Sequence, residues 1–78
     1  MSKHAVGSMW RGVNSQNDRF CRIWLSSRDK SGETWMWRIV NKDVKVLDAG
    51  IANSYRHCLK DSNFNSQSEK KVIFEKIR

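Results

Sequence analysis

The sequence is poor in cysteine, in acidic residues and in long apolar runs, and each shortage argues against a class of protein. Its cysteines are Cys21 and Cys58 alone, whereas a secreted domain of this size usually carries a denser disulfide framework. No apolar run approaches the roughly 20 residues that cross a bilayer. The N-terminus lacks an apolar signal core, because Lys3, His4 and Arg11 interrupt it. We therefore expect a cytoplasmic protein with reduced thiols and no membrane partner.

Motifs for catalysis or metal binding are also missing. The two histidines, His4 and His57, stand in no nucleophile elbow, and no glycine loop that could cradle phosphates is present. Cys21, His57 and Cys58 lack the paired spacing of a structural zinc site, and buried cysteine is common as a small hydrophobe. We predict a non-enzymatic protein with no catalytic residue, no metal and no cofactor. A basic ribonuclease built on either histidine with a lysine is the catalytic alternative.

Positive charge is what the sequence has in excess. Fifteen Lys and Arg stand against eight Asp and Glu, which gives a formal net charge of +7. Across residues 1–28, Asp18 is the single acidic residue. A field of this sign attracts phosphates and acidic surfaces. The charge thus indicates an anionic partner without specifying the fold.

The apolar pattern predicts one α+β domain in the order β-β-β-α-β, with a small antiparallel sheet of three to four strands and one helix packed on one face. With 78 residues, one domain is the expected count. Period-2 alternation predicts strands over residues 19–28, 33–42, 44–52 and 70–78. Helical spacing predicts a helix from Tyr55 to Ser62, with Ser54 as its N-cap. A four-residue turn over 29–32 would use Gly32 at positive φ, and Gly50 is a candidate β-bulge.

The first 18 residues show no sustained period. Turn formers such as Gly7, Gly12 and Asn14 interrupt them. We expect residues 1–18 to form a flexible or irregular N-terminal arm, with a short edge strand as the alternative. Residues 19–78 then form the α+β domain.

The two predicted strands 19–28 and 33–42 combine arginine with tryptophan. Arg22 and Trp24 share a face of the first strand, while Arg38 lies opposite to Trp35 and Trp37 on the second. Surfaces that bind nucleic acids combine cations for phosphates with rings for bases. The candidate nucleic-acid-binding residues, including two cations of the helix, are Arg19, Arg22, Trp24, Arg28, Trp35, Trp37, Arg38, Arg56 and Lys60. The alternative is a tryptophan-rich core ringed by solvated arginines.

Part of this region resembles a pattern found in small phage and prophage proteins. There, a W-x-W-x-[IV] strand leads to a second strand ending in G-x-A-x-S and then to a short helix. The residues that match are Trp35, Trp37, Ile39, Gly50, Ala52 and Ser54. The resemblance covers about a third of the chain and departs from the pattern at Cys58 and Leu59, where alanines are usual. It implies a mobile-element origin and transfers no functional residue.

Two functions from different classes follow. The first is binding of nucleic acid, DNA or RNA, through the Arg/Trp-rich hairpin. The second is inhibition of a host protein complex, of the anti-CRISPR or anti-restriction type that the resemblance implies, through an acidic surface of the partner. A homodimer is a further possibility, because an uncovered sheet face or edge can pair with a second copy.

Overall fold

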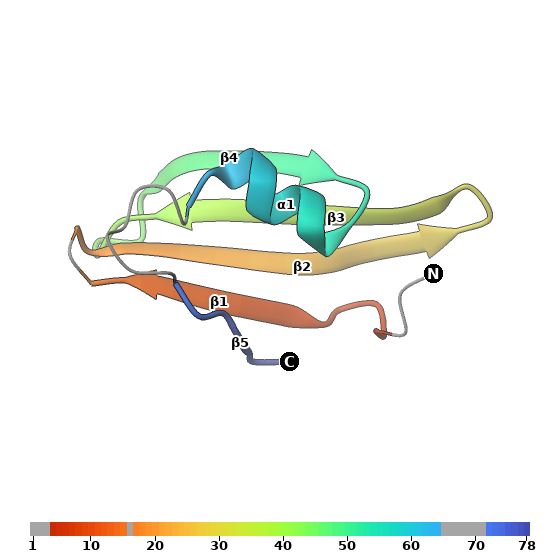
Figure 1. Cartoon of the computed structure of the whole chain (residues 1–78), viewed down its shortest axis with the longest axis horizontal. Coiled ribbons are helices and arrows are strands. Elements are labelled where there is room, and N and C mark those ends of the chain that lie inside the picture. Colours follow the sequence, from red (N-terminus) through yellow and green to blue (C-terminus); the bar gives the residue numbers. More distant parts are fainter. Residues whose placement is uncertain (1–3, 16, 65–71) are drawn as a thin grey trace.

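The computed structural model describes residues 4–15, 17–64 and 72–78. These residues form a five-stranded antiparallel sheet with one helix lying across one of its faces (Figure 1). The elements are β1 (Met9–Asn14), β2 (Arg19–Asp29), β3 (Gly32–Val40), β4 (Val46–Ala52), α1 (Tyr55–Ser62) and β5 (Glu75–Lys76). The sheet order is β4-β3-β2-β1-β5. The predicted α+β class is confirmed, with five strands where three to four were expected.

β1 is the main difference from the sequence-based expectation. Residues 9–14 were placed in an irregular arm or at a sheet edge, but they pair with β2 over their whole length. β5 pairs with the other side of β1, so β1 lies inside the sheet. The final strand is shorter than the predicted 70–78, of which residues 70 and 71 lie outside the described part. β4 has its bulge at Leu47, between the pairs Ile39–Asp48 and Val40–Val46, and not at Gly50.

The helix α1 depends on its caps and on the sheet. The Ser54 hydroxyl accepts the backbone N–H of His57 at 3.1 Å, as predicted. Asn63 ends the helix in the left-handed conformation, where its N–H donates to the Lys60 carbonyl. Eight residues are too few for a helix to be stable alone, so packing of Cys58 against the sheet holds it. In the part of the chain that the structure describes, no helix is long and apolar enough to span a membrane.

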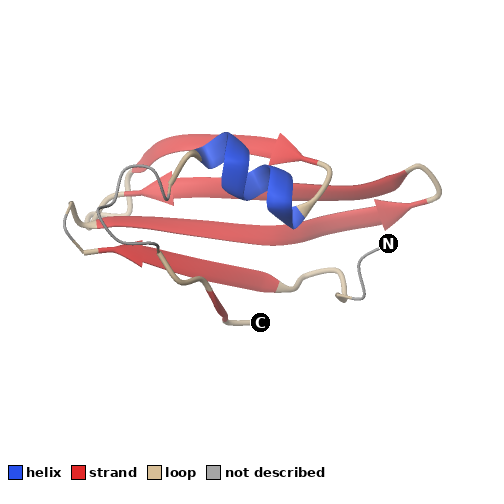
Figure 2. Cartoon of the chain, viewed as in Figure 1, coloured by secondary structure: helices blue, strands red, loops and turns tan. Residues whose placement is uncertain are grey.

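The helix α1 lies across one face of the sheet (Figure 2), and the hydrophobic core lies between the two. β2 and β3 each contribute every second residue to it. Cys58 of α1 completes it together with Phe64 and Val72. The buried residues are Cys21, Ile23, Leu25, Trp35, Trp37, Ile39, Cys58, Phe64 and Val72. A Cβ on Gly50 would lie 2.6 Å from the indole of Trp37. Glycine at this position therefore lets the large ring lie flat against β4.

Candidate nucleic-acid interface

The sheet face opposite α1 carries no described helix. We call it the open face. Strand register assigns to it Met9, Arg11, Val13, Phe20, Arg22, Trp24, Met36, Arg38, Val40, Val46, Ala49, Ile51 and Glu75. The alternation of side chains along each strand follows from the pleat, which sends successive residues to opposite faces. The core residues of β2 and β3 accordingly lie on the side of α1.

The register arranges the open face in three rows that run across the strands. In the middle row Arg11 lies opposite Arg22, and Arg22 lies opposite Arg38. We call these three residues the arginine row; Ala49 of β4 and Glu75 of β5 lie at its two ends. One flanking row holds Val13, Phe20, Val40 and Val46, and the other holds Met9, Trp24, Met36 and Ile51. Both flanking rows are entirely apolar.

In the absence of a ligand, repulsion within the arginine row lowers the stability of the protein. Like charges directly opposite each other on neighbouring strands destabilise a sheet. Among the described residues the one ion pair within 4.0 Å joins Arg28 to Glu33, so none of the three arginines has such a partner there. Arg38 instead lies over the ring of Trp24, its Cζ 5.9 Å from the ring centroid, a cation–π contact. An anion bound along the row would relieve the repulsion.

The apolar rows leave large side chains in contact with solvent. Val13, Val46 and Ile51 are 42%, 49% and 66% exposed, and the rings of Phe20 and Trp24 are half-buried. Contiguous apolar surface of this kind marks an interaction site on a monomeric protein. The open face thus combines three cations with apolar surface on both sides of them.

A hollow of about 220 Å³ is set into the open face beside the turn between β3 and β4. Its cationic lining is the arginine row together with Lys42, and Phe20 and Val40 supply apolar lining. Asn41 and Val44 complete it. Of the lining residues that the structure describes, none is acidic. The hollow is therefore suited to an anion with an apolar neighbour.

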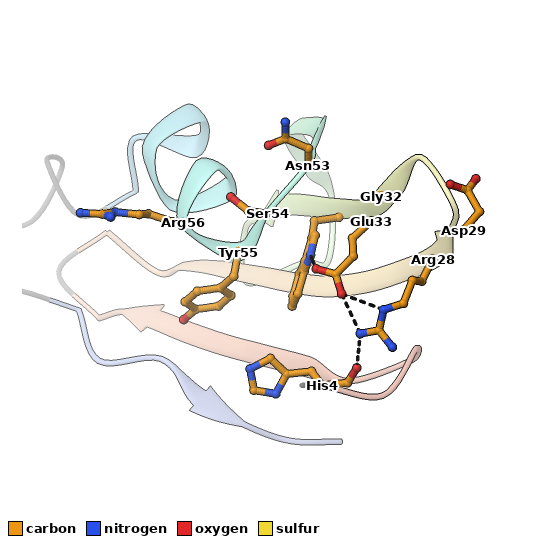
Figure 3. Close-up of a pocket in the computed structure, with 10 residues that line it drawn as sticks. His4, Arg28, Asp29, Gly32, Glu33, Asn53, Ser54, Tyr55 and Arg56 are labelled. Atoms are coloured by element: carbon orange, nitrogen blue, oxygen red, sulfur yellow. Dashed lines mark hydrogen bonds and ion pairs between the residues drawn. The ribbon is translucent and has the colours of Figure 1, made fainter. Parts of the chain in front are cut away.

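A larger concavity of about 870 Å³ lies on the side of α1, near the β2–β3 turn (Figure 3). Two of its charged side chains, Arg28 and Glu33, are engaged with each other. Arg28 donates to Oε2 of Glu33 from Nε at 2.9 Å and from Nη2 at 2.6 Å, and it also contacts the carbonyl of His4. The indole Nε1 of Trp35 donates to Oε1 of Glu33 at 3.1 Å. The hydrogen bonds from Trp35 and Arg28 lower the pKa of Glu33. These contacts tie the segment at His4 to the hairpin.

The structure brings together three of the predicted binding residues, Arg22, Trp24 and Arg38, on the open face. It corrects the expectation for two others, because Trp35 and Trp37 are only 1% and 5% exposed and pack in the core. The reason is physical: β2 and β3 carry large apolar side chains on both faces, and α1 covers the face that carries these two indoles.

The remaining predicted residues lie outside the open face. Arg28 is held by Glu33, and Arg19 is half-buried at the start of β2, where its register partner is the buried Asn14. Arg56 and Lys60 are exposed on α1, on the opposite side of the sheet. The predicted set is thus divided between two faces.

Sequence reasoning missed Arg11 and Lys42. Arg11 follows Trp10 in a segment that was not predicted as an interior strand, so its place opposite Arg22 could not be inferred. A signal was present, since Met9, Arg11 and Val13 alternate with Trp10 and Gly12. Lys42 was assigned to a turn, and nothing in the sequence places that turn beside the arginine row.

Among the described residues, neither the two thiols nor any group of metal-ligating side chains forms a competing site. Burial raises the pKa of Cys21 to about 12 and that of Cys58 to about 11, and reactive cysteines have lowered values. Within the described ranges, no three His, Cys, Asp or Glu residues cluster as metal ligands would. Comparison with protein families, with curated proteins and with solved structures finds no match for this chain.

Proposed function

We propose that this protein binds single-stranded nucleic acid across the open face. Phosphates would lie along the arginine row, and bases would stack on the rings of Phe20 and Trp24. The observation that carries the proposal is the row of Arg11, Arg22 and Arg38 in direct register between two apolar rows. Proteins that bind single strands combine a cationic track with aromatic rings on which bases stack.

The shape of the face favours a single strand over a duplex. The major groove of DNA admits a helix or a two-stranded ribbon, whereas the open face is one side of a five-stranded sheet and is not a projecting ribbon. A duplex also keeps its bases stacked inside, so its outer surface offers phosphates but no partner for Phe20 or Trp24. A single strand supplies both phosphates and unstacked bases.

The test is fluorescence polarisation with labelled single-stranded and duplex oligonucleotides at several salt concentrations. The open-face variant is Arg22→Gln with Arg38→Gln. Its matched control, with the same loss of charge, is Arg56→Gln with Lys60→Gln on α1. Each phosphate contact contributes about −0.7 to the log–log salt slope for a single strand. We expect the open-face variant to flatten the slope by roughly 1.4 if each arginine contacts one phosphate, and the control to leave it nearly unchanged.

Three outcomes would overturn the proposal. The first is an absence of binding to any strand at about 50 mM salt, where cationic contacts are strong. The second is tighter binding of duplex than of single strand by the wild-type protein. The third is an equal loss of affinity in both double variants, which would mean that net charge alone accounts for the binding.

A protein partner is the second candidate, and the free edge of β4 favours it. Val46, Leu47 and Ile51 of this edge strand are exposed, and an exposed edge can accept a strand from another chain. With the phage-type resemblance, such a protein would be a host-directed inhibitor. Pull-down from a bacterial lysate, with and without nuclease, separates the candidates: a protein retained after nuclease treatment favours the inhibitor.

A further inference from the structure

The hollow on the open face gathers more positive charge than the arginine row alone. Three cations reach it from three adjacent strands, and Lys42 reaches it from the β3–β4 turn. Four formal positive charges therefore surround a space of about 220 Å³. An internal phosphate of a nucleic acid carries one negative charge. A phosphate monoester carries about −1.5 to −2 at pH 7 and offers three acceptor oxygens.

The turn that supplies Lys42 is held in place by its own hydrogen bonds. The side-chain oxygen of Asn41 accepts the backbone N–H groups of Asp43 at 2.9 Å and Lys45 at 3.0 Å. The Asn41 carbonyl accepts the N–H of Val44 at 3.0 Å. A pre-formed turn positions a cation with little loss of chain entropy when a ligand binds.

Val44 in this turn has a φ of 63°, which a β-branched side chain rarely adopts. It is 75% exposed, and its conformation is the one that a three-residue hairpin loop requires of its last residue, here with Asn41 and Lys45 as the closing pair. Val44 thus helps to fix the loop that places Lys42 beside the hollow.

We propose that the hollow binds a terminal phosphate, the phosphate monoester at the end of a nucleic-acid strand. This inference rests on the proposed function, because it names the part of the strand that the hollow selects. Guanidinium groups can pair with such a phosphate in bidentate fashion, and Lys42 adds a point charge. The remaining nucleotides would extend over the apolar rows of the open face.

The test compares the affinities of one short oligonucleotide with a 5′-phosphate, with a 3′-phosphate, and with hydroxyl groups at both ends. A hydroxyl-ended strand one nucleotide longer controls for added charge, since it gains an internal phosphate instead. We expect one phosphorylated strand to bind at least tenfold more tightly than both hydroxyl-ended strands. The end that carries the effective phosphate identifies the polarity of binding.

Lys42→Gln should reduce this preference to less than threefold. Lys45→Gln is the matched control, because Lys45 is exposed in the same turn and does not line the hollow. It should retain the preference. Both lysines are exposed, so thermal unfolding should show that both variants are folded.

The failure of this inference is distinguishable from that of the proposed function. Equal affinities for all four strands, with binding retained, would overturn the terminal-phosphate site and leave single-strand binding intact. Binding of a phosphorylated strand that depends on Lys42, without binding of either hydroxyl-ended strand, would support the terminal-phosphate site and overturn binding along the open face. If no strand binds, both proposals are overturned.

Discussion

At the scale of one residue, Val44 shows how the turn beside the open-face hollow costs stability. Its left-handed backbone conformation costs a residue with a Cβ roughly 1–2 kcal/mol. Glycine adopts that conformation freely, although it also makes the unfolded chain more flexible, which offsets part of the gain in stability. We expect Val44→Gly to raise the free energy of unfolding by roughly 1 kcal/mol, measured by urea unfolding with tryptophan fluorescence. A destabilised variant would mean that the exposed side chain makes contacts that outweigh the strain.

Two buried tryptophans differ in what their indole N–H groups contact. Trp35 donates to Glu33, whereas Nε1 of Trp37 finds no hydrogen-bond partner among the described residues. An unsatisfied buried donor costs stability, so its removal offsets part of the packing lost with the ring. We expect Trp37→Phe to destabilise the protein less than Trp35→Phe does. Urea midpoints of the two variants give the order, and the reverse order would contradict this account.

At the scale of the elements, close contact between β3 and β4 depends on Gly50, which lies opposite Trp37. An added Cβ would meet the indole at 2.6 Å, and overpacking of a core costs typically 1–3 kcal/mol. We predict that Gly50→Ala lowers the free energy of unfolding by about that amount. Ala49→Thr, at the neighbouring position on the open face, should change it by less than about 0.5 kcal/mol. Equal effects in thermal or urea unfolding would refute the packing argument.

Most elements could be predicted because their signals are local. Alternation in β2 and β3 and the Ser54 cap of α1 are properties of short segments, and the structure confirms them. β1 could not be predicted as an interior strand, because its inward positions hold Gly12 and Asn14 where apolar residues were required. Gly12 is needed there for a reason that only the fold reveals: a Cβ would lie 2.7 Å from the ring of Phe74.

At the scale of the whole molecule, stability above pH 9 depends on the two buried thiols. The unfolded chain releases these protons near pH 9, whereas burial raises the pKa of Cys58 to about 11 and that of Cys21 to about 12. Stability is therefore complete below pH 9 and falls as the pH rises toward 11. Each thiol contributes up to about 1.4 kcal/mol per pH unit.

Urea unfolding between pH 8 and pH 11 measures this slope. The double variant Cys21→Ala with Cys58→Ala should show a shallower loss of stability than the wild type does. A parallel pH dependence in the two proteins would exclude the thiols as its source.

The binding surface was only partly predictable, because charge indicates a partner and not a face. β2 and β3 carry large apolar side chains on both sides, so periodicity alone could not decide whether Trp24 or the pair Trp35 and Trp37 would be covered. The position of α1 decides it. Arg11 joins Arg22 and Arg38 only through the pairing of β1 with β2, which is a long-range property of the fold.

The most direct test of the central claim is a nuclear magnetic resonance titration with a single-stranded oligonucleotide. It follows the side-chain Nε–H signals of arginine and tryptophan. We predict that Arg11, Arg22, Arg38 and Trp24 shift together, while Arg56 and the indoles of Trp35 and Trp37 change little. Shifts concentrated at Arg56 and the other cations of α1, with the arginine row unchanged, would contradict the assignment of the open face as the binding surface.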